Sequence, residues 1–405
     1  MPTKPLVLKF KQVIKAPASA VYRAFTSSTA LRQWFCDAAQ ADPRPDGRLY
    51  LWWHSGYYTS GEFIALTPDK KLNFTWRGKG EPAPTRVTVS LAPKGDSTTL
   101  TVTHHQIGRG RLWASLATEY ARGWEAALLN LQSVLEAGPD LRIVRRPMLG
   151  ISGGEDVTPG SAAKLGLPVK AGLQLEGVIE GMGAQAAGLQ PRDVLVKLGD
   201  KKIAGYSSLA DALAGHRAGD VVPVVFYRGA ERKTAQLKFS ARPLPDIPAT
   251  TAELAEAVRQ RYAESDADLA KAFEGVPEAA AARRPAPGAW NALENLAHLI
   301  LGERDQTVFI AELLAGNERW YDGYGTNLPA PNEAVIAVYP TASELLAALK
   351  RTEAETVALI DALPPEFASR KDSYWRLGMV LPFLTMHIYE HIDQIKATLK
   401  AAQTG

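Results

Sequence analysis

Apolar residues recur at helical spacing through the last third of the chain, and this pattern predicts four long helices. The expected segments are 251–273, 291–316, 341–363 and 377–402. The apolar stripe of the last segment consists of Val380, Leu384, Ile388, Ile392 and Ile395. Helices of this kind bury their stripes against one another, so residues 246–405 are predicted to form a four-helix bundle.

Two histidines beside this stripe, His387 and His391, are four residues apart. Residues at this spacing project from one helix face, about 6 Å apart, so two imidazoles can share one divalent ion. The best candidate for a third ligand is His298. Asn291 and Glu294 have the spacing of an N-terminal capping box, which places His298 near the second turn of its helix. Three neutral imidazoles with open water positions suit Zn, Ni, Fe or Mn, and the sequence does not choose among them.

Two other interpretations fit the histidine pair. An isolated pair on a helix is also compatible with ordinary polar residues, one bonded to a carbonyl and one at the surface. The segment 387–391 further fits the H-x-x-E-H motif of inverted zinc proteases, with Glu390 as the general base. We disfavour this motif because such proteases need an acidic ligand well downstream, whereas Asp393 is two positions from His391. Glu390 also points about 100° away from His391 on a helix.

The bundle region resembles the DinB-like metal-binding family, which includes thiol-dependent transferases and maleylpyruvate isomerases. The resemblance rests on Trp290, on the run Asn-Ala-Leu-Glu-Asn-Leu-Ala-His at 291–298, and on His387 and His391. It implies that His298 of the second helix and the two histidines of the fourth bind a divalent metal.

Residues 316–340 form a long connection between the second and third predicted helices. The segment is rich in Gly, Asn and Pro and contains Trp320, Tyr321 and Tyr324. Long connections in compact domains often carry function. The segment is predicted to be either a lid over the metal site or a packed connection.

The first third of the chain alternates between apolar and polar residues, which predicts an antiparallel sheet. The expected strands are 8–14, 48–53, 58–67, 71–77, 86–93 and 97–104. Helices are expected at 18–25 and 112–137, and a hairpin turn at 93–96.

This order resembles the START-like helix-grip superfamily, in the branch named for activators of the large heat-shock ATPase. The matching stretches are 13–25, 31–35, 99–104 and 123–131. The resemblance implies a curved sheet around a long helix, with an apolar cavity for a small hydrophobic ligand. Aromatic residues suited to line it are Trp53, Phe74, Trp76 and Trp113. Core packing would use many of the same residues. No catalytic residue is expected here, since His104 and His105 have no evident acid or nucleophile partner.

The middle third is rich in Gly and Val and resembles a PDZ domain of the type attached to HtrA-like bacterial proteases. The matching stretches are 149–151, 187–189, 193–195, a helix at 208–214 and 223–229. The resemblance implies that the loop at Leu149, Gly150 and Ile151 accepts the C-terminal carboxylate of a partner protein.

Two catalytic motifs in the middle third are interpreted as coincidental. A G-x-S-x-G pattern at 150–154 is followed by Pro159 and Gly160, which leave no room for the helix that must follow the serine. A G-x-G-x-x-A pattern at 181–186 is followed by Pro191, which ends any helix within two turns.

Composition narrows the possible partners and the compartment. With 46 Lys and Arg against 43 Asp and Glu, the net charge is +3. Because both signs are scattered and no run of five or more like charges occurs, neither nucleic acid nor a membrane is an expected partner. The single cysteine, Cys36, excludes an intramolecular disulfide, and the start lacks a signal-type apolar stretch, so a cytoplasmic location is expected. Cys36 itself is expected to be a small buried residue more often than a reactive thiol.

The predicted fold class is multidomain α+β. A helix-grip antiparallel sheet with a long C-terminal helix spans 1–139, a PDZ-like β-rich domain spans 140–245, and a four-helix bundle spans 246–405. The leading functional hypothesis is a cytoplasmic, stress-related binding protein that combines a hydrophobic-ligand cavity, a peptide-binding module and a metal-binding bundle. The second is a metal-dependent thiol transferase or hydrolase, in which metal on His298, His387 and His391 lowers the pKa of a water or thiol.

Overall fold

The computed structural model describes residues 6–317 and 327–404, without the side chains of 381–385 and 403–404. The chain divides into two compact units. One is Leu141–Leu244, and the other combines Met1–Asp140 with Pro245–Gly405. The fold is mixed helix and sheet, as predicted: an antiparallel sheet with a long helix, a second sheet, and C-terminal helices. No helix among the described residues is both long enough and apolar enough to cross a membrane.

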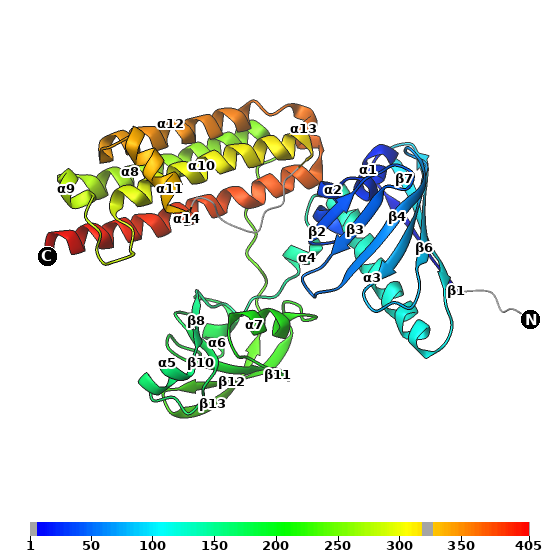
Figure 1. Ribbon diagram of the computed structural model, residues 1–405, viewed down its shortest axis with the longest axis horizontal. Helices are drawn as coiled ribbons and strands as arrows, with labels where there is room; N and C mark the ends of the chain where they lie inside the picture. Colours follow the sequence, from blue (N-terminus) through cyan, green and yellow to red (C-terminus); the bar gives the residue numbers. More distant parts are fainter. Residues whose placement is uncertain (1–5, 318–326, 405) are drawn as a thin grey trace, which may run out of the picture. The chain divides into compact units, whose positions relative to one another are not determined.

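The N-terminal part is a seven-stranded antiparallel sheet in the order β1-β7-β6-β5-β4-β3-β2 (Figure 1). Its strands are β1 (Leu6–Ile14), β2 (Ala38–Ala41), β3 (Arg48–Trp52), β4 (Tyr58–Thr67), β5 (Lys71–Gly78), β6 (Thr85–Lys94) and β7 (Ser97–Ile107). Alternate residues of β7 are buried, which is the period-two pattern of a sheet with one face on a core. The predicted hairpin is confirmed, because Lys94 pairs with Ser97 and Gly95 has a φ of 57°.

Helices α1 (Ala18–Thr26), α2 (Ser28–Trp34) and α3 (Arg111–Glu136) belong to the same part, with the short α4 (Leu141–Val144) at its boundary. The long α3 has 26 residues and contributes Trp124, Leu128 and Leu131 to the core. Sequence analysis missed α2 and β2. Both are too short for a period to register, because α2 has two turns and β2 has four residues. Cys36 is fully buried, as expected.

The central unit is a second sheet, in the order β13-β12-β10-β9-β8 with β11 beside β10. Its strands are β8 (Gly154–Val157), β9 (Gly172–Leu175), β10 (Val194–Leu198), β11 (Lys201–Lys202), β12 (Val221–Arg228) and β13 (Glu231–Lys238). Its helices are α5 (Pro159–Lys164), α6 (Gly183–Ala186) and α7 (Tyr206–Leu213). Strand β8 follows Ser152, and α6 has only four residues, so neither coincidental motif has the helix that its chemistry needs.

Four long helices form the C-terminal part: α8 (Thr251–Phe273), α10 (Ala292–Ala315), α12 (Ala342–Asp361) and α14 (Lys371–Thr404). Helices α8 and α10 each pack against both α12 and α14, so α8 and α10 lie on a diagonal of the bundle. Capping boxes start three of the four helices, at Thr250, Asn291 and Thr341. The predicted box at Asn291 and the helix start at Ala292 are confirmed.

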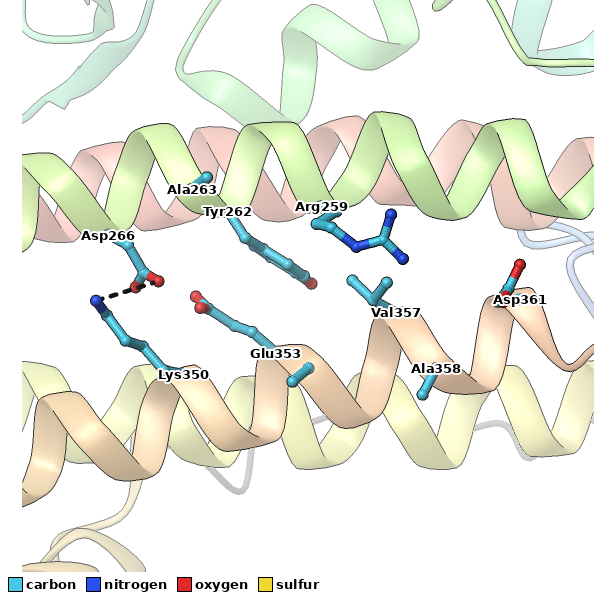
Figure 2. Close-up of a pocket in the computed structure, with 10 residues that line it drawn as sticks. Arg259, Tyr262, Ala263, Asp266, Lys350, Glu353, Val357, Ala358 and Asp361 are labelled. Carbon is cyan, nitrogen blue, oxygen red and sulfur yellow. Dashed lines mark ion pairs between the residues drawn. The ribbon is translucent and has the colours of Figure 1, made fainter.

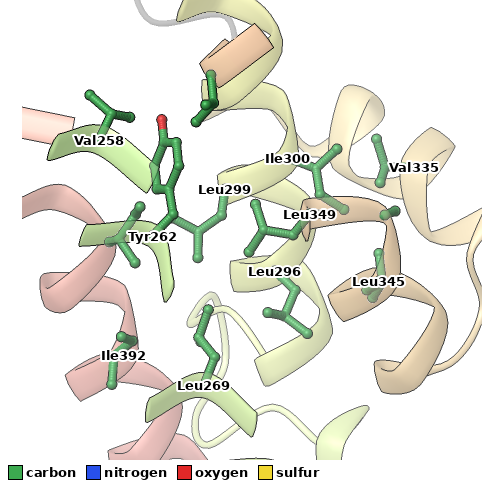
Figure 3. Packing of buried hydrophobic residues seen from close by; sticks show 14 of the residues in the cluster. Val258, Tyr262, Leu269, Leu296, Leu299, Ile300, Val335, Leu345, Leu349 and Ile392 are labelled. Carbon is green, nitrogen blue, oxygen red and sulfur yellow. The ribbon is translucent and has the colours of Figure 1, made fainter. Parts of the chain in front are cut away.

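Leucine and isoleucine side chains fill the centre of the bundle (Figure 3). Leu296 and Ile300 of α10 are fully buried, as are Leu345 and Leu349 of α12. These residues recur at intervals of four on each helix, and that spacing places them on one face.

Two boundaries in this part differ from the prediction. Helix α14 begins at Lys371, six residues before the expected start beside Gly378. Gly378 lies inside the helix, where a Cβ would come within 2.9 Å of three side-chain carbons of Ile247. Glycine therefore permits close packing at this position and does not end the helix. The predicted connection 316–340 contains helix α11 (Pro329–Val338), and α9 (Glu278–Ala281) and α13 (Pro365–Ser369) are further short helices.

Candidate metal centre

Three histidines from two helices of the bundle come together. His298 lies in the second turn of α10, and His387 and His391 lie one turn apart on α14. His298 is 4% exposed and His391 is 6% exposed, while His387 is half-buried. The helical stripe that buries Ile388 also carries His391 into the interior.

The ring nitrogens of these histidines converge. The Nε2 atom of His387 lies 3.1 Å from Nε2 of His298 and 3.0 Å from Nε2 of His391. One ligand atom from each residue fits within 4.8 Å of the others. Ligands at about 2.1 Å from a metal are separated by about 3.4 Å in tetrahedral geometry and about 3.0 Å at neighbouring octahedral positions. The cluster thus has donor atoms and spacing that fit a divalent metal of either geometry, and the distances do not select one.

Asn295 orients one of the three rings. Its Oδ1 lies 2.8 Å from Nδ1 of His391, and its Nδ2 donates to the carbonyl of Asn291 at 2.8 Å. The second bond fixes which end of the amide faces the ring, so Oδ1 accepts and Nδ1 of His391 carries the proton. The lone pair of His391 is then on Nε2, which faces the other two histidines.

The indole ring of Trp290 lies against two of the three histidine rings. Its ring is stacked on that of His391, with an interplanar angle of 17° and centroids 6.2 Å apart, and its centroid lies 5.0 Å from that of His298. An indole at this place shields the imidazoles from solvent and restricts their rotation.

Burial favours the neutral form of two of the imidazoles, those of His391 and His387. Burial and the neighbouring His387 and His298 together lower the pKa of His391 to about 3. Burial also lowers the pKa of His387, together with His298, while Glu390 acts in the opposite direction. Neutral imidazole is the form that ligates a metal.

Glu390 does not join the cluster. Its side chain is exposed, as is that of Asp393. Among the described residues, the ligand set at this place contains the three histidines and no carboxylate. The arrangement therefore differs from an inverted zinc-protease site, in which the glutamate of the motif faces the metal region.

Three family descriptions match the chain in separate stretches. Residues 15–136 match "Activator of Hsp90 ATPase homolog 1-like protein", residues 152–239 match "PDZ domain", and residues 261–395 match "DinB superfamily". The chain joins an Hsp90-activator-like domain, a PDZ domain and a DinB domain. The three resemblances stated from the sequence are confirmed, and the three histidines lie within the DinB match.

Curated relatives share only a part of the chain. Serine protease Do-like HtrA of Lactococcus lactis subsp. lactis (strain IL1403) is 32% identical over 117 residues, which are 28% of this chain and 28% of that protein. The same protein of Lactococcus lactis subsp. cremoris (strain MG1363) is 34% identical over 101 residues, which are 24% of this chain and 25% of that protein. The chain thus spans about a quarter of the length of these relatives.

Solved structures similar to this chain cover about a third of it. CalU16 from Micromonospora echinospora is 26% identical, with a TM-score of 0.27, over 32% of this chain and 75% of that chain. Protein CV1439 from Chromobacterium violaceum is 24% identical, with a TM-score of 0.29, over 33% and 98%. The HSP90 activator PFC0360w from Plasmodium falciparum is 23% identical, with a TM-score of 0.28, over 32% and 96%.

The four aromatic residues predicted to line a cavity lie in the core of the Hsp90-activator-like domain. Phe74 is 2% exposed and Trp76 is 5% exposed, and Trp53 and Trp113 are partly buried against the same core. Their placement satisfies core packing, which was the alternative interpretation. The ligand cavity stays a prediction.

A polar group that sequence analysis missed lies in the same interior. Glu81 is 5% exposed and accepts hydrogen bonds from Tyr57 Oη at 2.9 Å and from the Gly78 amide at 2.7 Å. His104 is fully buried, and its Nδ1 accepts from Trp124 Nε1 at 3.3 Å. Burial lowers the pKa of His104 to about 3, so this ring is neutral. A buried glutamate directly before a proline in a loop gives no periodic signal, so no pattern could have revealed it.

The loop of the PDZ domain that is predicted to bind the C-terminal carboxylate of a partner begins at a buried residue. Leu149 is 3% exposed, Gly150 has a φ of 87°, and Ile151 bridges to Val178. The Gly150 conformation is one that other residues rarely adopt, and a Cβ there would collide with the side chain of Met182. The loop therefore has a backbone shape that depends on glycine. Its role in peptide binding stays a prediction.

The aromatic residues of the predicted lid over the metal site fall outside the described part of the chain. These residues are Trp320, Tyr321 and Tyr324.

Proposed function

We propose that this chain is a multidomain binding protein whose DinB domain holds a divalent metal on His298, His387 and His391. The observation that carries the proposal is the convergence of three imidazole nitrogens from α10 and α14, with both Nε2 separations from His387 at 3.0 to 3.1 Å. Three converging imidazoles, two of them buried, favour a metal over a purely structural cluster.

The donor set leaves the metal open among Zn, Ni, Fe and Mn. Asn295 supports the proposal, because a hydrogen bond to the second ring nitrogen is the usual way in which proteins orient a histidine ligand. In this proposal, the PDZ domain binds the C-terminal peptide of a partner through Leu149, Gly150 and Ile151. The Hsp90-activator-like domain takes a small hydrophobic ligand beside Trp53, Phe74, Trp76 and Trp113. A stress-related role and a cytoplasmic location belong to the same proposal.

Metal analysis of the purified full-length protein tests the central claim. After reloading with zinc and dialysis, the protein is expected to retain about one metal ion per chain by plasma mass spectrometry. His387→Ala is expected to lower that content at least about tenfold. The control is His54→Ala, since His54 is an exposed histidine of the first domain. Unchanged metal content in His387→Ala would rule out the site.

A second candidate function is metal-dependent thiol transfer or hydrolysis at the same site. Two observations favour it. Among the described residues, the ligand set contains three side chains, which leaves coordination positions free. His387 is half-buried and so accessible from one side. A bound divalent metal supplies Lewis acidity that makes a water or thiol acidic enough to ionise near neutral pH. The residues of this chain would hold the metal, orient His391 through Asn295 and exclude water beside Trp290.

The two candidates are distinguished by an activity assay on protein of known metal content. Transfer of a thiol to an electrophilic acceptor, and hydrolysis of an activated ester, are measured before and after removal of metal by a chelator. Activity that follows metal content and disappears in His387→Ala identifies an enzyme. Full metal content without either activity leaves the binding function.

A further inference from the structure

A pocket of about 420 Å³ opens between α8 and α12, and these helices do not carry the metal-site histidines (Figure 2). Its polar lining consists of Arg259, Tyr262, Asp266, Lys350, Glu353 and Asp361. Its apolar walls are formed by Ala263, Ala354, Val357 and Ala358. The volume is that of a site for a small organic molecule and is far larger than a site for one ion.

Glu353 is the unusual member of this lining. Its side chain is 3% exposed, and among the described residues no amide, hydroxyl or ammonium group donates to either carboxyl oxygen. Figure 2 shows the carboxyl group extending from α12 toward α8, beside Asp266. The hydrogen bond that Glu353 makes there is to this second acid. Two carboxyl groups can share one proton, but together they have more acceptor oxygens than donors. A buried acid pair that lines a pocket is therefore short of donors, which a ligand in that pocket can supply.

Glu303, directly behind the pocket, provides the contrast. It is 3% exposed, like Glu353, but it accepts hydrogen bonds from Tyr262 Oη at 2.9 Å and from Thr356 Oγ1 at 3.0 Å. The bundle therefore satisfies one buried glutamate from its own side chains and leaves the neighbouring one without donors. Because protein hydroxyl groups satisfy the carboxyl group of Glu303, Glu303 is not part of the candidate site.

Asp266 adds a second acceptor at the same end. One of its oxygens, Oδ1, is buried and lacks a hydrogen-bond partner among the described residues. The other lies 3.8 Å from Nζ of Lys350, whose side chain is 53% exposed. A contact of this length to a solvated lysine is weak and can yield to a better donor.

We propose that this pocket binds a small organic cation through a primary ammonium group, which donates hydrogen bonds to Glu353 and Asp266 while its hydrocarbon stem lies along the alanines and Val357. An ammonium group offers three donors, which match the unpaired oxygens of the two carboxyl groups. The positive charges at the rim do not prevent this, because Arg259 pairs with Glu256 and the side chain of Lys350 is 53% exposed and therefore solvated.

A divalent metal fits this pocket less well. Hard cations such as Ca²⁺ take six to eight oxygen ligands. Among the described residues, the carboxyl groups of the lining are those of Asp266, Glu353 and Asp361, and Asp361 lies eight positions from Glu353 along α12. Two nearby cationic side chains would also repel a doubly charged ion more than a singly charged one.

The electrostatics of the pocket provide a specific signature of binding. Burial and, to a smaller extent, the charges of Asp266 and Glu303 together raise the pKa of Glu353 to about 9. The groups that face Glu353 are Tyr262 and Asp266 from α8, Glu303 from α10 and Lys350 from its own helix. At neutral pH Glu353 is therefore protonated, and an arriving ammonium group favours its ionised form. Binding is expected to release about one proton to the solvent.

The test is titration calorimetry of the full-length protein with n-butylammonium chloride, in two buffers of different ionisation enthalpy at about pH 7.5. Wild type is expected to bind and to release about one proton per ligand. Glu353→Gln keeps the shape and the neutral form of the side chain, and is expected to bind at least about tenfold more weakly without proton release. Ala354→Phe fills the groove at an exposed position and is expected to lose binding similarly.

The control variant is Glu355→Gln, which makes the same chemical change at an exposed position of α12 and is expected to bind like wild type. Tetramethylammonium, which has the charge but no donors, and 1-butanol, which lacks the charge, are expected to bind at least about tenfold more weakly than n-butylammonium. Equal binding by wild type and Glu353→Gln would overturn the proposal. So would tighter binding of butyrate, displacement of the amine by Ca²⁺, or no binding of the amine at tens of millimolar.

Discussion

Removal of the Asn295 side chain tests whether the orientation of His391 matters for metal binding. Asn295 is 1% exposed, and its Oδ1 accepts the Nδ1 proton of His391 over 2.8 Å. In Asn295→Ala that N–H stays buried without an acceptor, at a cost of about 1–3 kcal/mol. Since about 1.4 kcal/mol is a factor of ten, metal affinity is expected to fall by roughly 5- to 150-fold, a range that includes the effect typical of lost partners of metal-bound histidines.

Competition with a chromophoric chelator of known zinc affinity measures this effect in the full-length protein. Asn295→Asp is the matched variant, because a carboxylate at the same place still accepts the proton and is expected to keep zinc affinity at or above that of wild type. Circular dichroism confirms that α10 is intact in both variants. Affinity within about twofold of wild type in Asn295→Ala would refute the reasoning, as would an equal loss in Asn295→Asp.

Three further predictions concern stability. Burial raises the pKa of Glu353 from 4.5 to about 9, so the folded state keeps a proton that the unfolded chain loses, and wild type loses stability as the pH rises between these values. The free energy of unfolding of Glu353→Gln, relative to that of wild type, is therefore expected to rise by up to about 2–3 kcal/mol between about pH 5.5 and pH 7.5. Hydrogen exchange of α12 amides measures this difference, and a difference that does not change with pH would contradict the prediction. Arg228 donates to both oxygens of the buried Asp193, at 2.9 and 2.8 Å. Arg228→Lys is therefore expected to lower the free energy of unfolding of the PDZ domain by about 1–2 kcal/mol, measured by urea unfolding. An unchanged unfolding midpoint would contradict a stabilising role of this two-bond contact. At Gly150 the backbone has a positive φ and an added Cβ would collide with a neighbour, whereas Gly188 has a φ of 78° and open space around it. Gly150→Ala is therefore expected to lower the melting temperature of the PDZ domain more than Gly188→Ala does. Equal effects would show that crowding is unimportant.

Much of the fold could be predicted because long elements carry many repeats of their period. The bounds of α8 are those expected, and α10 and α12 differ from expectation by one or two residues at each end. Short elements were missed, such as α2 with seven residues, or were assigned to a loop, such as α11 with ten. The early start of α14 was missed for a different reason. Whether Gly378 ends a helix or permits close packing depends on Ile247, which lies more than a hundred residues away in the sequence.

The three histidines could be brought together from the sequence because local rules determined most of their geometry. The spacing of His387 and His391 places both on one helix face, and the capping box at Asn291 places His298 in a defined turn of α10. The role of Asn295 was not predicted, although it lies one turn before His298 on the same face. An asparagine at that position has many possible partners, and only the packing of α10 against α14 selects the ring of His391.

The pocket between α8 and α12 shows what a sequence pattern cannot distinguish. Glu303 and Glu353 both interrupt apolar stripes. From the sequence alone, each would be expected to be exposed, or else to indicate that the buried face of its helix was assigned wrongly. Only the positions of Tyr262 and Thr356 separate them, because both side chains donate to Glu303, whereas Glu353 faces a second acid, Asp266. A second acid that serves only the fold would be costly to bury, and apolar residues at that position would pack at lower cost, so a ligand explains its presence better than stability does.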